Sequence, residues 1–184
     1  MDVQVAHEAA LQSALISGFD PRVESDEKYQ MHQSVMEQIL ACKTGALTHP
    51  LIINMTLCEH REPKYRRGIR AAEAGFLPDA KYVKRLLFIR WMLVERAVPQ
   101  MRTENEEDRE KFCWEQHDFF LCLEPFIRAN SRTARIIYYM LATSLKVPVK
   151  VIRAEKAGIY YRNSEEYRKS IFAPDMRARG YIAS

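Results

Sequence analysis

The sequence lacks the long apolar run of a membrane-spanning helix, since no stretch approaches the roughly 20 residues needed to cross a bilayer. Its beginning, with Asp2, His7 and Glu8, also lacks the basic and then apolar order of a signal peptide. No internal repeat and no low-complexity segment occur. These absences argue against a membrane protein or a repeat array. They predict a cytoplasmic protein with no membrane partner, and leave delivery into another cell open.

Paired metal-ligand spacing is missing as well. The chain has four cysteines, at Cys42, Cys58, Cys113 and Cys122. Two of them, Cys113 and Cys122, lie in or beside apolar helical runs, so we interpret the cysteines as buried thiols of a cytosolic protein. The histidines show no mutual spacing that suggests a site either, and the sequence therefore predicts no bound metal.

What the sequence does have is the composition of a soluble globular protein. It is 184 residues long, 47% hydrophobic and 28% charged, enough for one domain with a substantial core. The net charge of +4 permits an anionic ligand. Because acids are interleaved with the basic residues nearly everywhere, the pattern makes a nucleic-acid partner unlikely.

Apolar residues recur mainly at helical spacing and predict an all-α fold of six or seven helices. Residues 59–75 differ, since they are charged and carry proline and glycine, which favours an exposed hairpin or loop. We expect N-terminal helices in residues 1–46, packed on a main body over residues 47–172, and a loosely held tail over 173–184. The expected helices cover residues 3–16, 25–40, 48–58, 79–98, 103–123 and 132–145, with a short last helix opened by Asn163-Ser-Glu-Glu166. The apolar run 48–58 also fits a buried strand, and a helix is favoured because the segments around it are helical.

The stretch 123–135 stands between two of these helices and carries a polar turn. Ser131 is expected to be the N-cap of the second helix, because its hydroxyl can accept from free backbone N–H groups. Arg132 and Arg135 are three positions apart, so they share a helix face and are expected to grip one oxyanion at that helix start. The plainer alternative is a solvated helix start with ordinary surface arginines.

The same stretch, Glu124-Pro-Phe-Ile-Arg-Ala-Asn-Ser-Arg-Thr-Ala-Arg135, resembles the signature loop of the Fic/Doc (Fido) family, His-Pro-Phe-x-Asp-Gly-Asn-Gly-Arg-x-x-Arg. Further similarities lie around it over roughly residues 47–172, including His117 seven positions before Glu124 and Tyr65-Arg-Arg-Gly-Ile-Arg70 at the place of the family's β-hairpin flap. The positions that match the signature are Pro125, Phe126, Asn130, Arg132 and Arg135.

The resemblance implies a Fic-like helical domain with a small β-hairpin flap before the motif helix. Members transfer part of a nucleotide, most often AMP from ATP, to a Ser, Thr or Tyr hydroxyl of another protein. It therefore implies ATP or another nucleotide as cofactor and a protein as partner, either a target or a regulatory chain. By position, the resemblance implies that five residues bind the phosphates: Arg128, Asn130, Ser131, Arg132 and Arg135. It implies that four residues form the target-aligning flap: Arg67, Gly68, Ile69 and Arg70.

The departures from the signature bear on activity. Glu124 stands where the family has its catalytic His, and an exposed glutamate is a weak base for a hydroxyl. Arg128 stands where the family has the acid that holds Mg²⁺, which speaks against magnesium here. Ala129 and Ser131 replace two glycines, and Ala129 would be strained if this position needs a positive φ.

Three interpretations follow. In the first, the domain is degenerate, lacks AMP transfer and binds an anion, a nucleotide or a protein. In the second, it is an active transferase of altered chemistry that uses Glu124 or His117 as base and the arginines as a phosphate pocket. In the third, it is a small helical adaptor with no nucleotide role. His117 lies two helical turns from the motif, so a hydrogen-bonded core histidine is the preferred interpretation of that residue.

Overall fold

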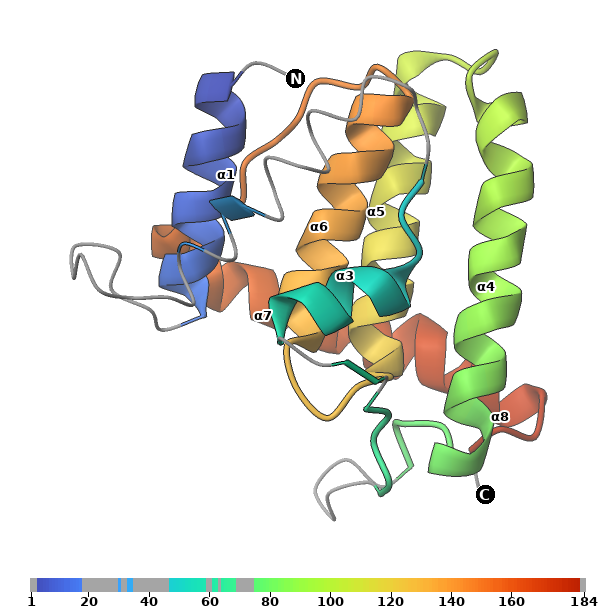
Figure 1. Cartoon of the computed structure of the whole chain (residues 1–184). Coiled ribbons are helices and arrows are strands. Elements are labelled where there is room, and N and C mark those ends of the chain that lie inside the picture. The colour runs from blue at the N-terminus through green and yellow to red at the C-terminus, as the bar shows by residue number, and fades with distance from the viewer. Residues whose placement is uncertain are drawn as a thin grey trace.

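The computed structural model describes residues 3–17, 30, 33–34, 47–58, 61–62, 64–68 and 75–182. Within these residues the fold is all-helical, as the periodicity predicts, and no strand forms, so the expected β-hairpin is not seen there (Figure 1). The helices are α1 (Val3–Ile16), α3 (Pro50–Leu57), α4 (Ala80–Met101), α5 (Glu106–Leu123), α6 (Asn130–Ser144), α7 (Ala157–Tyr167) and α8 (Ala173–Ala178). A 3₁₀ turn (Ala154–Lys156) precedes α7, and a π-helical turn (Arg168–Phe172) joins α7 to α8.

The helices expected over 3–16, 48–58, 79–98 and 103–123 are confirmed, with small differences at their ends. Asn105 caps α5, since its side chain accepts from the backbone N–H of Asp108 at 2.9 Å. Of the helix predicted over 25–40, only residues 30, 33 and 34 are among the described residues, and these three are helical. No described helix combines the length and the apolar character needed to span a membrane.

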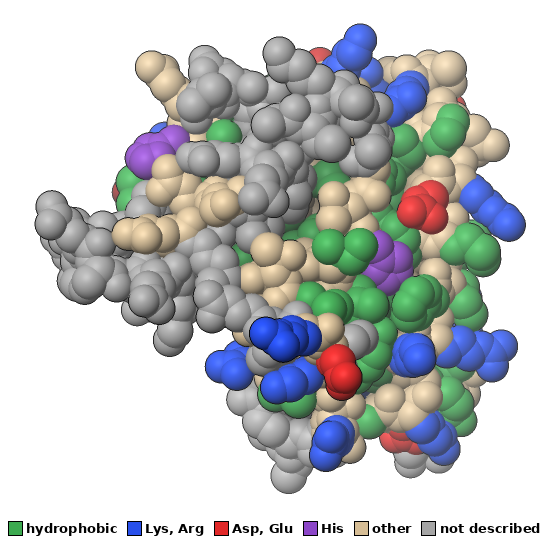
Figure 2. Space-filling view, viewed as in Figure 1, with side chains coloured by type: hydrophobic (Ala, Val, Ile, Leu, Met, Phe, Trp, Pro, Cys, Tyr) green, Lys and Arg blue, Asp and Glu red, His purple; other side chains and the backbone are tan. Residues whose placement is uncertain are grey.

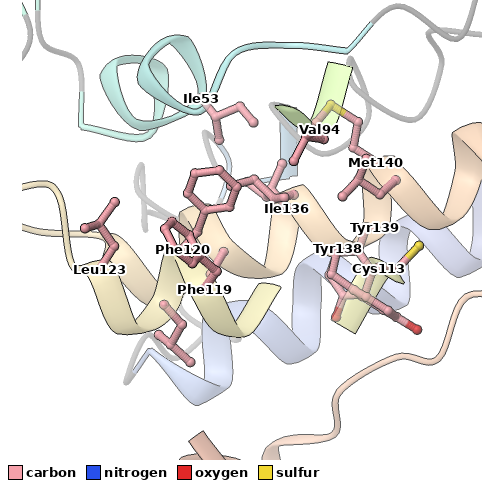
Figure 3. Close-up of a cluster of buried hydrophobic side chains, with 14 of the residues drawn as sticks. Ile53, Val94, Cys113, Phe119, Phe120, Leu123, Ile136, Tyr138, Tyr139 and Met140 are labelled. Carbon is pink, nitrogen blue, oxygen red and sulfur yellow. The ribbon is translucent and has the colours of Figure 1, made fainter. Parts of the chain in front are cut away.

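The centre of the fold is the pair of helices α5 and α6, which run side by side (Figure 1). Every residue of α6 from Thr133 to Ala142 is buried. Figure 3 shows Ile53 of α3 pointing toward Ile136 of α6 and Phe120 of α5. In Figure 1, α1 and α4 lie on opposite sides of this pair. One hydrophobic cluster extends from Ala6 to Ile182, so the described helices share a core.

The end of the chain does not form the loosely held tail that we predicted. Ala173, Met176 and Ile182 are buried in the core. The carbonyl of Tyr181 accepts from the backbone N–H of Asp79 at 2.9 Å, and the rings of Tyr181 and Tyr82 lie 5.2 Å apart. The apolar residues among the polar ones in this segment therefore dock it onto the start of α4.

Candidate functional site

The connection between α5 and α6, residues 124–129, is called the motif loop below. Glu124 ends α5 with φ 44° and ψ 58°, and Ala129 precedes α6 with φ 62° and ψ 22°. Both lie in the left-handed region, which costs a non-glycine residue roughly 1 kcal/mol or more. The positive φ that we considered for Ala129 is therefore present. Ser131 is not the N-cap, because α6 already begins at Asn130 and Ala129 occupies the cap position without a side-chain bond.

Asn130 closes the motif loop on itself. Its Oδ1 accepts from the backbone N–H of Phe126 at 2.9 Å, and its Nδ2 donates to the carbonyl of Phe126 at 2.9 Å. Both ends of the amide are thus engaged with the backbone of the loop. The residue lies at the site as predicted, but these bonds shape the loop rather than leave the amide open to a ligand.

A second asparagine, Asn54 of α3, fixes the loop from the other side. Its Nδ2 donates to the carbonyl of Arg128 at 3.0 Å and to Oγ1 of Thr133 at 3.2 Å, and its side chain is buried. Sequence reasoning missed Asn54. The available signal was a carboxamide inside the otherwise apolar run 51–55, since a buried amide needs partners.

The extended segment 64–68 lies against the motif loop. The backbone N–H of Arg66 donates to the carbonyl of Pro125 and that of Ile127 donates to the carbonyl of Lys64, both at 3.1 Å. These bonds form one isolated antiparallel bridge between Tyr65 and Phe126, whose rings stack 6.0 Å apart. The predicted hairpin flap is not confirmed. Of its expected target-aligning residues, Arg67 and Gly68 are exposed beside this bridge, whereas Ile69 and Arg70 lie outside the described residues.

A pocket of about 700 Å³ opens beside the motif loop and is called the loop pocket below. It lies between the loop, the first residues of α6, the helix α7 and the π-helical turn. Glu124, Arg128, Asn130 and Ser131 line it, so four of the six residues predicted at the site come together. Its other lining residues are Phe76, Leu121, Ile127, Tyr161, Ser164, Glu165, Arg168 and Lys169.

The charges of the loop pocket are mostly paired. Nη2 of Arg168 donates to Oε1 of Glu124 at 2.5 Å, and Nζ of Lys169 lies 2.6 Å from Oε1 of Glu165. Arg128 is exposed, and its guanidinium has no hydrogen bond or ion pair within the part of the chain that the structure describes. Figure 2 shows basic side chains gathered on the face below α3, toward the loop that joins α5 to α6 in Figure 1. The pocket therefore carries one uncompensated positive charge.

Arg168 was not predicted, because it lies 44 residues from Glu124 in the sequence. Burial opposes its charge, but Glu124 beside it and the thiol of Cys122 raise the pKa of Arg168 above its ordinary value. Its Nε is buried and has no acceptor among the described residues.

Arg135 does not join Arg128 in the pocket, contrary to the prediction that Arg132 and Arg135 grip one anion. Its side chain is fully buried and reaches α1, where Nε donates to Oγ of Ser13 at 2.7 Å. Its Nη2 donates to the carbonyl of Ser13 at 3.0 Å and to Oγ of Ser17 at 2.8 Å. These hydrogen bonds hold α6 against the C-terminal end of α1. The dipole of α1 favours a cation such as Arg135 at that end.

Arg132 does not line the loop pocket either. Burial, and after it the positive charges of Arg135 and Arg128, lower the pKa of Arg132, while the nearby thiol of Cys58 raises it. Of the predicted phosphate-binding residues, Arg132 is thus close enough to Cys58, Arg128 and Arg135 for their charges to act on it, but it is not part of the pocket lining.

His117 is a core histidine, as we preferred. It is fully buried, with Nδ1 at 2.8 Å from Oδ1 of Asp118 and Nε2 at 3.0 Å from the hydroxyl of Tyr160. Burial lowers its pKa, although the hydrogen bond and charge of Asp118 act in the opposite direction.

Among the described residues, no three or more His, Cys, Asp or Glu side chains lie together in a group that could hold a metal ion. In the comparisons with known proteins, no protein-family model, no curated protein and no solved structure matches this chain. The function therefore has to be argued from the site itself.

Proposed function

We propose that this chain binds a phosphate-bearing ligand, a nucleotide, in the loop pocket and does not transfer it. The observation that carries the proposal is Arg128, a cation without a partner among the described residues, at the rim of a pocket that also contains the start of α6. The first backbone N–H groups of a helix have no acceptor within the helix and attract anions. The hydroxyl of Ser131 adds a donor beside them.

The dimensions of the pocket agree with a ligand of this size. Binding pockets for small molecules commonly measure about 300–1,000 Å³, and this one has about 700 Å³. Phe76, Ile127 and Tyr161 supply apolar and aromatic surface in the lining, which a nucleobase can contact. A nucleotide bound with its phosphates near Arg128 and its base near these side chains would contact both the charged and the apolar part of the pocket.

The ion pair of Glu124 favours binding over transfer. A general base must accept a proton from the substrate, yet one oxygen of Glu124 already accepts from Arg168 at 2.5 Å. We therefore favour a degenerate relative of the Fic/Doc family that acts by binding, with another protein as partner. An active transferase that uses Glu124 is the second candidate, since Glu124 does line the pocket.

Calorimetric titration with ATP, ADP and adenosine, with and without Mg²⁺, tests the proposal. We expect ATP and ADP to bind without Mg²⁺ and adenosine to bind far more weakly. Arg128→Gln should weaken ATP binding by about tenfold, the loss of roughly one charge-assisted hydrogen bond, and leave adenosine unchanged. Arg96→Gln, an exposed arginine on α4, is the matched control and should leave every affinity unchanged.

Equal ATP affinity in wild type and Arg128→Gln would contradict the proposed site. Adenylyl transfer to a protein in a lysate that Glu124→Gln abolishes would instead establish the second candidate. No saturable binding of any of the three ligands would leave the helical adaptor as the remaining interpretation.

A further inference from the structure

Helix α4 has a second apolar surface, directed away from the core. Phe88, Ile89, Met92 and Leu93 are each between 37% and 48% exposed. Phe88 and Met92 are four positions apart, and so are Ile89 and Leu93, so the side chains form two neighbouring rows on the helix. We call these four residues the α4 face. In Figure 2, hydrophobic and basic side chains lie along the side of the molecule that α4 occupies in Figure 1.

A groove of about 180 Å³ lies along one edge of the α4 face, between α4 and the π-helical turn. Ile89 and Leu93 line it from α4, and Ile171, which is 56% exposed, lines it from the π-helical turn. On the other row, Phe88 contacts the ring of His49 with centroids 4.8 Å apart. Two apolar rows beside a recess form the kind of surface onto which the side-chain ridge of another helix packs.

Uncompensated cations lie at one end of the α4 face. Lys84 and Arg85 precede Phe88 and Ile89 by four positions each, so they continue the two rows toward the start of α4. Both are exposed, and neither forms a hydrogen bond or an ion pair with a described residue. Each row therefore begins with a free positive charge and goes on with exposed apolar side chains.

The other charges beside the α4 face occur in opposite pairs, which cancel. The pairs are Lys81 with Asp79 at 3.6 Å, Arg179 with Asp175 at 2.8 Å, Arg90 with Glu115, whose charge acts on it, and the exposed neighbours Glu95 and Arg96. Behind Phe88, His49 is uncharged at neutral pH because burial lowers its pKa, although the charge of Glu95 acts in the opposite direction. The positive charges of Lys84 and Arg85 therefore remain.

A second copy of this chain does not complement the α4 face. Two such faces packed antiparallel would set Lys84 and Arg85 opposite Glu95 and Arg96, whose charges cancel, so the cations would gain no partner. The start of α5 is acidic, but none of the exposed large hydrophobic residues of the described chain lies in α5. A flat bilayer surface would contact the two rows without entering the groove.

We propose that the α4 face binds an amphipathic helix of another protein, with acidic residues at one end of its apolar stripe. The stripe packs on the two rows and into the groove, and the acidic end meets Lys84 and Arg85. The α4 face shares no residue with the lining of the loop pocket, so this proposal does not depend on the proposed nucleotide binding.

Fluorescence anisotropy of labelled synthetic peptides with the whole chain tests the proposal. The first peptide has about 18 residues, with leucines at helical spacing and glutamates gathered in its first turn. The second peptide carries glutamines in place of the glutamates. We expect saturable binding of the glutamate peptide and at least about fivefold weaker binding of the glutamine peptide, the effect of two exposed ion pairs.

Two variants locate the binding surface. The double variant Lys84→Gln/Arg85→Gln should weaken the glutamate peptide by about fivefold and leave the glutamine peptide unchanged. Leu93→Gln, at an exposed position that the fold tolerates, should weaken both peptides by about tenfold because it removes apolar contact. Lys156→Gln and Ile159→Gln, at exposed positions outside α4, are the matched controls and should change neither affinity.

The proposal is overturned by the absence of saturable binding, by equal affinities of the two peptides, or by full affinity for the glutamate peptide in the double variant or in Leu93→Gln. A dimer in sedimentation that Leu93→Gln abolishes would instead assign the α4 face to a second copy. Binding to phosphatidylserine vesicles that Leu93→Gln abolishes would assign it to a membrane surface. Either result would also overturn the proposal.

Discussion

Two arginines of the same stretch, Arg128 of the motif loop and Arg135 in the interior behind it, lie in opposite environments, since Arg128 is exposed and Arg135 is buried. In the interior, His117 has a partner on each ring nitrogen, and Arg135 makes three hydrogen bonds to Ser13 and Ser17, although its Nη1 has no partner among the described residues. At the loop, Arg128 has no side-chain partner among the described residues, and Glu124 and Ala129 adopt left-handed backbone conformations. Buried polar groups with partners stabilise a fold, whereas exposed charge on strained backbone is typical of binding sites.

The largest expected difference concerns two arginines of the same motif. Arg135→Met should lower the free energy of unfolding by about 3 kcal/mol, because the buried Ser13 and the partly buried Ser17 lose their donors. Arg128→Met should change it by no more than about 0.5 kcal/mol, as an exposed substitution does. Urea unfolding of both variants measures this contrast. Similar losses in the two would mean that the interior and the loop do not differ as described.

The second prediction concerns the pH dependence of stability. Burial lowers the pKa of His117, so below about pH 6.5 the unfolded chain takes up a proton that the folded chain does not. Stability contributed by this group is therefore complete above pH 6.5 and decreases as the pH falls toward the lowered pKa, by up to about 1.4 kcal/mol per pH unit.

In His117→Gln, the urea midpoint of unfolding should change less between pH 7 and pH 5 than it does in wild type. The pKa of His49 is also lowered, by burial against the opposing charge of Glu95, so part of the slope should remain in that variant. An unchanged slope in His117→Gln would show that His117 does not supply this dependence.

The smallest expected effect is on the strained loop backbone. Ala129→Gly should raise the free energy of unfolding by about 1 kcal/mol, since glycine adopts a φ of 62° without a Cβ penalty. Ala157→Gly, at a right-handed helical position with φ −56°, is the control and should lower it by about 0.5–1 kcal/mol. A loss of stability in both variants would contradict the strain assigned to Ala129.

Much of the helical pattern could be predicted from sequence because its signals are local. The apolar spacing over residues 3–16 and 48–58 gives α1 and α3 with errors of at most two residues. The start of α6 was misplaced because Ala129, the residue at the cap position, has no side chain that could signal a cap. Because Ser131 is a typical capping residue, the predicted start of α6 lies two positions too far along the chain.

The candidate site was only partly predictable, because its decisive contacts join distant residues. Arg132 and Arg135 look equivalent in the sequence, yet Arg135 donates a hydrogen bond to Ser13, 122 residues away. Asn54 and Arg168 lie 74 and 44 residues from their partners in the motif loop. Local periodicity carries no information on such contacts.

Titration of wild type and Arg128→Gln with ATP in the absence of Mg²⁺, followed by analysis of the nucleotide for products, tests the central claim most directly. The account predicts saturable binding by wild type, an affinity about tenfold lower in Arg128→Gln and intact ATP in both samples. Equal affinities, or ATP consumed by wild type, would contradict a binding pocket that depends on Arg128 and does not transfer its nucleotide.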